Sequence, residues 1–281
     1  MFLTISFRFS GILVNLQREI CKFMEMTFIV RHESWELALV LFAFMMIFII
    51  AGLYLGRKYF AEREKDGNVL ASLFAILGLM LAFTFGMSLT RYEKRIDIMV
   101  EESNNIGTAV LRADLYPEEY RQQFRADFKQ YVEVRIAYFA AGSDTGKILA
   151  AHRDSEAIQK RLWDRAAQLS ANPAVTTTAS MQMVPALNEM IDITNTRWRM
   201  NMNKVPEPVL YLLLILICIC AFELGYTMSA KKRTDWLGIM GVVLLVCTVV
   251  HLIMDLDRSR RGVITLEEMN QSIVDLRGMF K

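Results

Sequence analysis

A carboxylate inside an apolar stretch is the first candidate for chemistry in this chain of 281 residues. Glu223 lies within the run Val209–Met228. Burying an unpaired carboxylate in lipid costs free energy, so such a residue is first taken as a functional candidate. The alternative is that Glu223, in the outer third of this run, lies near the lipid headgroups and pairs with Arg57 or Lys231. Both interpretations make it an intramembrane polar residue.

Charged and titratable residues also gather at the end of the last apolar run. His251 and Asp255 are four residues apart, so they share one face of a helix and could hold a proton or a metal. No further ligand is near in sequence, so we predict an interfacial pair that ends the run rather than a metal site. Arg258, Arg260 and Arg261 follow, as is typical of residues that contact lipid headgroups or draw anions toward a pore.

Composition excludes several function classes. The net charge of +2 argues against a nucleic-acid partner. Three of the four cysteines fall inside apolar runs, and their spacing matches neither a disulfide framework nor a zinc site. The chain has no glycine-rich phosphate loop, no G-x-S-x-G and no HExxH. We therefore predict no catalytic residue, metal or cofactor, and a protein that is not an enzyme.

A long helix is the element expected to position the remaining candidates. The apolar segment from Val69 to Thr90 is long enough to span a bilayer. No proline or turn cluster follows it before Pro117, and Gly107 is the next glycine. We predict one continuous helix from Val69 to about Leu115, with its first half in lipid and its second half in water.

Three further apolar runs predict spans at residues 35–54, 209–228 and 236–254, and the polar stretch from Pro117 to Lys204 has helical periodicity. The predicted fold class is an all-α membrane protein with four transmembrane helices and a helical soluble domain. Four spans put both termini and this domain on one side, and the distribution of Lys and Arg favours the cytoplasmic side. The predicted domains are an N-terminal segment 1–34, two spans in 35–90, a helical soluble domain 91–206, two spans in 207–256 and a C-terminal tail 257–281.

The N-terminal segment allows two interpretations. Apolar residues recur in it at helical spacing between basic residues, which is typical of an amphipathic helix on a membrane surface. Translation that begins at Met24 or Met26 explains the segment equally well.

Two faces of the predicted long helix differ in character. One carries a stripe of small residues that favours close helix packing in lipid: Ala71, Ala75, Gly78, Ala82 and Gly86. The other carries a seam of residues mostly seven apart: Met80, Met87, Lys94, Glu101, Asn105 and Arg112. The seam fits either the lining of an axial channel in an oligomer or a contact with the helix that follows Pro117.

Four strings in a fixed order resemble the bacterial family called bestrophin-like. They are E-E-S-N-N-I-G-T-A-x-L-R-A-D-L (Glu101–Leu115), A-L-N-E-M-I-D (Ala186–Asp192), V-P-x-P (Val205–Pro208) and D-L-D-R-x-R-R-G (Asp255–Gly262). Ser259 departs from the family, which usually has proline there. A more remote similarity to bestrophin anion channels implies a pentamer of four-span subunits in the bacterial inner membrane, with an apolar neck at the second span.

The resulting functional prediction is an oligomeric, anion-conducting channel whose neck can dewet. Its partners would be the lipid bilayer, inorganic anions and further copies of the chain. The alternative is a non-conducting scaffold whose helical cytoplasmic domain recruits a protein partner. From the helix-face argument, the expected pore-lining residues are Leu73, Leu77, Met80, Thr84, Met87 and Arg91.

Overall fold

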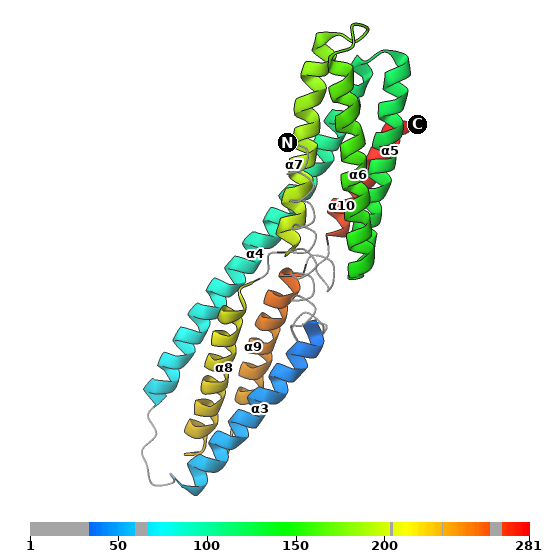
Figure 1. Ribbon diagram of the computed structural model, residues 1–281. Coiled ribbons are helices and arrows are strands. Elements are labelled where there is room, and N and C mark those ends of the chain that lie inside the picture. The colour runs from blue at the N-terminus through cyan, green and yellow to red at the C-terminus, as the bar shows by residue number, and fades with distance from the viewer. Residues whose placement is uncertain (1–33, 60–66, 203–204, 232, 259–265) are drawn as a thin grey trace, which may run out of the picture. The chain divides into compact units, whose positions relative to one another are not determined.

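The computed structural model describes residues 34–59, 67–202, 205–231, 233–258 and 266–281, and every regular element in these ranges is a helix (Figure 1). The predicted N-terminal surface helix lies outside the described residues. The chain divides into two compact units. We call them the membrane unit (residues 1–85 and 207–254) and the helical unit (residues 86–206 and 255–281).

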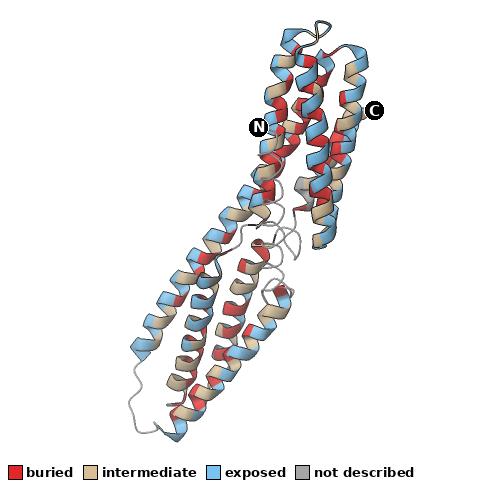
Figure 2. Cartoon of the chain, in the orientation of Figure 1, coloured by how far each residue is buried: buried red, intermediate tan, exposed pale blue. Residues whose placement is uncertain are grey.

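The membrane unit holds the four predicted spans, each of them long and apolar enough to cross a bilayer. They share one apolar core, to which every span contributes buried residues such as Met45, Leu77, Ile217 and Val243. Much of the remaining apolar surface of these helices is exposed in the single chain (Figure 2). The spans are the helices α3 (Ser34–Lys58), the first part of α4 (Gly67–Arg112), α8 (Glu207–Met228) and α9 (Trp236–Leu256).

Glycines let α3 and α8 approach very closely. A Cβ atom added at Gly52 would lie 2.2 Å from the carbonyl oxygen of Phe222, and one at Gly225 would lie 2.0 Å from that of Ile49. Only hydrogen fits in these places, so the two backbones touch as small residues permit in lipid. The close helix contact of this unit is therefore between α3 and α8. Gly78 of α4 makes no such contact within the chain, because a Cβ atom added there would meet nothing within 4 Å.

Local signals in the sequence set the bounds of the helical unit's elements. Asp144 caps its helix by accepting a hydrogen bond from the Lys147 N–H at 3.1 Å. Gly142 adopts φ +54° after the preceding helix, a conformation that favours glycine. Pro117 occupies the cap position rather than the first helical turn, and Pro185 lies inside a helix. The elements are the rest of α4, η1 (Ala113–Leu115), α5 (Glu118–Ala140), α6 (Thr145–Ser170), α7 (Thr177–Met202), α10 (Glu267–Asp275) and η2 (Leu276–Phe280).

The core of the helical unit lies among α4, α5, α6 and α7, with aromatic residues such as Phe124 and Phe128 fully buried. The segment predicted as a charged tail also contributes, because Ile273 and Leu276 are buried in this core. The Ser103 hydroxyl donates to the carbonyl of Ser272 at 2.9 Å. The chain end from Glu267 therefore belongs structurally to the helical unit.

Candidate functional site

One face of α4 is buried against the other spans of the same chain. Leu77 and Leu81 belong to the core of the membrane unit, and Leu77 is 1% exposed. Thr84 is also 1% exposed, and its hydroxyl donates to the carbonyl of Met80 at 2.7 Å. Leu77 and Thr84 are two of the residues expected to line a pore, and in the single chain both side chains are buried.

A second face of α4, about a quarter turn from the first at 100° per residue, is exposed and carries large apolar residues. Ile76 is 52% exposed and Phe83 is 63% exposed, while Met80 is half-buried at the edge of this face. Met87, one turn further along the helix, is exposed. We call these four residues the α4 outer face. It is displaced from the predicted lining by less than a quarter turn, at 100° per residue.

The small stripe also points away from the subunit. Ala71, Ala75, Gly78 and Ala82 are exposed. Gly86, the fifth residue of the stripe, is half-buried. At 100° per residue the stripe lies more than a quarter turn from the α4 outer face, and a helix of another molecule could approach it closely. Of the other predicted lining residues, Leu73 is half-buried, and Arg91 is half-buried beside Asp257.

The later part of the predicted seam contacts α7. Asn105 donates its side-chain N–H to the carbonyl of Glu189 at 3.4 Å, and Arg112 donates to that of Gln182 at 3.3 Å. Lys94 and Glu101 are exposed. The seam thus divides: its end packs on α7 of the same chain, and its middle, at Lys94 and Glu101, is exposed.

A cluster around Asp257 joins α4 to the residues that follow α9. Arg91 and Arg95 each place a guanidinium nitrogen 3.7 Å from the same Asp257 oxygen. Arg95 donates to the carbonyl of Leu256 at 3.0 Å, which satisfies the end of α9. Asp257 also accepts from the backbone N–H of Val205 at 3.2 Å. Two of the strings that carried the resemblance, V-P-x-P and D-L-D-R, therefore meet here.

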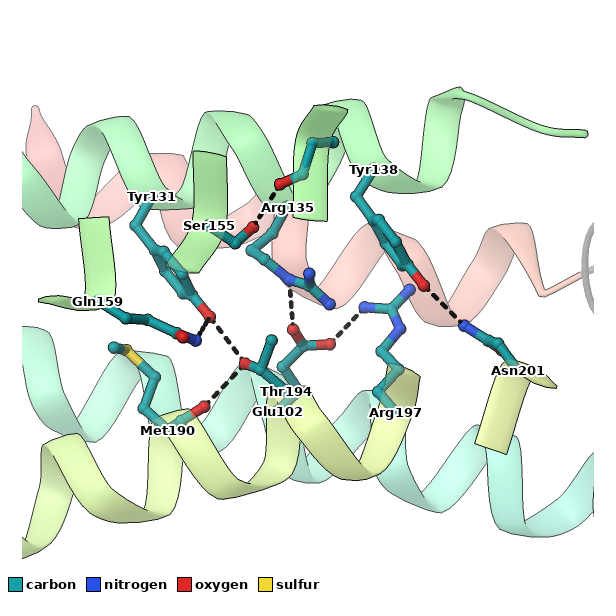
Figure 3. Close-up of polar contacts among 11 residues, drawn as sticks. Glu102, Tyr131, Arg135, Tyr138, Ser155, Gln159, Met190, Thr194, Arg197 and Asn201 are labelled. Carbon is teal, nitrogen blue, oxygen red and sulfur yellow. Dashed lines mark hydrogen bonds and ion pairs between the residues drawn. The ribbon is translucent and has the colours of Figure 1, made fainter. Parts of the chain in front are cut away.

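A buried ion triad lies inside the helical unit (Figure 3). Glu102 of α4 is fully buried and accepts hydrogen bonds from two arginines. The Arg135 Nε lies 2.6 Å from one Glu102 oxygen, and the Arg197 Nη1 binds the other. The Glu102 carboxylate raises the pKa of Arg135 against the opposing effect of burial. Because two cations share one carboxylate, the triad carries one excess positive charge.

Neutral groups extend the triad along the helices in Figure 3. The hydroxyl of Tyr131 lies 2.7 Å from that of Thr194 and accepts a hydrogen bond from Gln159 at 2.9 Å. Both arginines pass over the ring of Tyr138, at 4.5 Å for Arg135. The chain of buried polar contacts fixes the register of α4, α5, α6 and α7 against one another.

His152 is the buried titratable residue next to this network. Its ring stacks on that of Trp198, with centroids 4.1 Å apart and planes 4° from parallel. Burial, followed by the positive charge of Arg135, lowers the pKa of His152 to about 4. Glu156 lies 3.5 Å away from the imidazole. At neutral pH His152 is therefore an uncharged aromatic partner of Trp198.

The intramembrane polar candidates, Glu223 and His251, have few polar contacts within the described residues. Glu223 is half-buried, and within the described residues it has no hydrogen bond or ion pair, including with Arg57 or Lys231. Arg57 instead donates to the Thr234 hydroxyl at 2.8 Å. The Nδ1 atom of His251 is buried, with no partner in the part of the chain that the structure describes.

Of the candidate residues at and after the end of α9, the structure describes Asp255 and Arg258. Asp255 is buried, and the backbone N–H of Arg258 donates to its carbonyl at 3.0 Å. Arg260 and Arg261 lie outside the described residues. No group of three or more potential metal ligands is found over the described ranges.

Comparison with known proteins gives a consistent family and fold. The model of the bestrophin-like domain matches residues 43–269. A search of curated proteins finds no match. A tryptophan-to-alanine variant of a bacterial bestrophin homologue from Klebsiella pneumoniae is similar, with a TM-score of 0.66 at 12% identity over 88% of this chain and 99% of that one. An isoleucine-to-threonine variant of the same homologue has a TM-score of 0.64 at 13% identity, over 86% and 98%.

Proposed function

The chain belongs to the bestrophin-like family, and from this premise we propose that it assembles with copies of itself into an ion channel of the membrane. The spans, the family and the fold support a channel in general. The observation that carries the proposal is the split of α4 into a face packed on its own subunit and an outward face. A helix that lines the pore of a ring-shaped oligomer needs one face that packs on its own subunit and one that faces the axis.

The α4 outer face is the proposed neck. Ile76, Met80, Phe83 and Met87 supply bulky apolar side chains on successive turns. Rings of such residues gate a pore because water leaves a narrow apolar constriction. The small stripe, on another exposed side of α4, is the proposed contact with the next subunit, where exposed alanines and glycine allow close approach.

Ion selectivity is part of the proposal. The family resemblance supports anions, whereas the charge of Arg91 is paired with Asp257. The exposed charges that follow on α4 are Glu93, Lys94, Asp97 and Glu101, so that three acidic residues oppose one basic residue. These carboxylates act against anion entry. The reversal potential measured in a chloride gradient shows whether the channel selects anions or cations.

We expect purified protein in liposomes to conduct ions, and Phe83→Ala to raise the flux several-fold because the neck widens and wets more easily. Leu245→Ala is the matched control, since this residue of α9 is 65% exposed and lies on a different span. Its flux should equal that of the wild type. Absence of flux in every anion and cation gradient would support the scaffold with a cytoplasmic partner instead.

A further inference from the structure

A small pocket, partly open to the outside, lies in the helical unit. Arg95 of α4 and Arg197 and Asn201 of α7 line it, and the rest of its wall is apolar, including Ile98 and Phe139. None of its lining residues, all of which belong to the described ranges, is acidic. The two arginines are 3% and 4% exposed. A buried wall that presents cations and no carboxylate favours an anion.

The charge balance beside the pocket points the same way. Glu102 is the only acidic ion-pair partner of Arg135 and Arg197 among the described residues. One positive charge therefore remains uncompensated in a region of low dielectric constant, where burying it is costly. Arg197 uses Nη1 to bind Glu102, and its guanidinium has further N–H groups with which to hold an anion.

The size of the pocket limits the ligand. Its free space holds about one water-sized particle. Phosphate, sulfate and organic carboxylates are larger than this. A single halide ion, although larger than water, is the anion nearest to this size, and its one charge equals the excess charge of the triad.

We propose that this pocket binds one small monovalent anion with the size and charge of chloride. Arg197 and Asn201 would supply N–H donors, and Arg95, which shares Asp257 with Arg91, would add to the positive potential. Binding would stabilise the packing of α4 against α7. The site goes beyond conduction, because it lies within one subunit and needs no flow of ions through the assembly.

Anomalous diffraction from crystals of the full-length protein grown in sodium bromide tests the proposal directly. We expect a bromide peak in the pocket, within contact distance of the Arg197 guanidinium, as for a charge-assisted hydrogen bond. An empty pocket, or one with a water peak and no anomalous signal, overturns the proposal.

Thermal unfolding of the full-length protein in detergent gives a second test. Chloride replaces gluconate at constant ionic strength, and the midpoint should rise by on the order of 3 °C for each tenfold increase in chloride once the site fills. Ile98→Phe fills the pocket without changing charge and should abolish this rise. Val100→Phe, two residues along α4 at a 40% exposed position, should keep it. If Ile98→Phe keeps the rise, or the wild type shows none, the proposal is wrong. Neither test depends on whether the protein conducts.

Discussion

Glu102 is the residue on which the interior of the helical unit depends. Its two carboxylate oxygens bind two buried arginines that come from different helices, α5 and α7. Removing the carboxylate leaves Arg135 and Arg197 facing each other without compensation. The neighbouring residue, Glu101, is exposed on the other side of α4 and provides a natural comparison.

We expect Glu102→Gln to destabilise the helical unit by about 3–5 kcal/mol, which is the usual cost of breaking a buried ion pair from one side. Glu101→Gln should change stability by less than about 0.5 kcal/mol, as for most surface substitutions. Thermal unfolding in detergent measures both. Equal losses for the two variants would show that the triad does not stabilise the unit.

His152 makes the stability of the helical unit dependent on pH. Its pKa of about 4 in the folded protein lies below the roughly 6.5 of an unfolded chain. Between these values the unfolded chain binds a proton that the folded protein does not bind. Stability is therefore fully present above pH 6.5 and is lost as the pH falls toward 4.

The corresponding prediction is that the unfolding midpoint of the wild type falls by several degrees between pH 7 and pH 5. His152→Phe keeps an aromatic ring against Trp198 and removes the titration, so its midpoint should fall less over the same range. Differential scanning fluorimetry at the two pH values measures this. The same fall in both proteins would assign the pH dependence to other groups.

At the scale of elements, α4 could be predicted almost to its ends. Its apolar half has membrane length, and neither proline nor a turn cluster interrupts the chain before Pro117. The direction of its faces could not be predicted. Small residues pack equally well on a helix of the same subunit or of another, and α3 and α8 supply the closer contact within this subunit.

The α3–α8 contact gives a test at this scale. Gly225→Ala would place a Cβ atom 2.0 Å from the Ile49 carbonyl oxygen, so the helices must separate, at a cost of about 1–3 kcal/mol or more. Gly241→Ala in α9 meets nothing within 4 Å and should leave the unfolding midpoint unchanged or slightly higher. A Gly225→Ala protein as stable as the wild type in detergent would contradict this close packing.

Two features of the helical unit were missed from the sequence for physical reasons. Glu102, Arg135 and Arg197 stand in polar, charge-rich helices, where such residues are usually solvated. Only the tertiary fold brings them together, since the positions are far apart in sequence. The C-terminal helix α10 has nine residues, too few for its periodicity to distinguish a docked helix from a charged tail.

At the scale of the whole molecule, the sequence was sufficient for the fold class and the family. Four membrane-length runs and one uninterrupted helix define the architecture, and the ordered strings identified the family that its domain model matches. The proposed pore was harder to predict, because a surface between copies of the chain would leave no mark in one chain beyond an exposed apolar face. Of the six predicted lining residues, Leu77 and Thr84 are buried within the single chain, while Met80 and Met87 lie on the α4 outer face.

The cross-section of the purified assembly in lipid nanodiscs, determined by cryo-electron microscopy, tests the central claim most directly. We predict a closed ring of subunits in which α4 surrounds the axis, with Ile76 and Phe83 pointing toward it and the small stripe against the neighbouring subunit. A dimer, a centre filled by lipid, or an axis lined by a different helix would contradict the proposed channel.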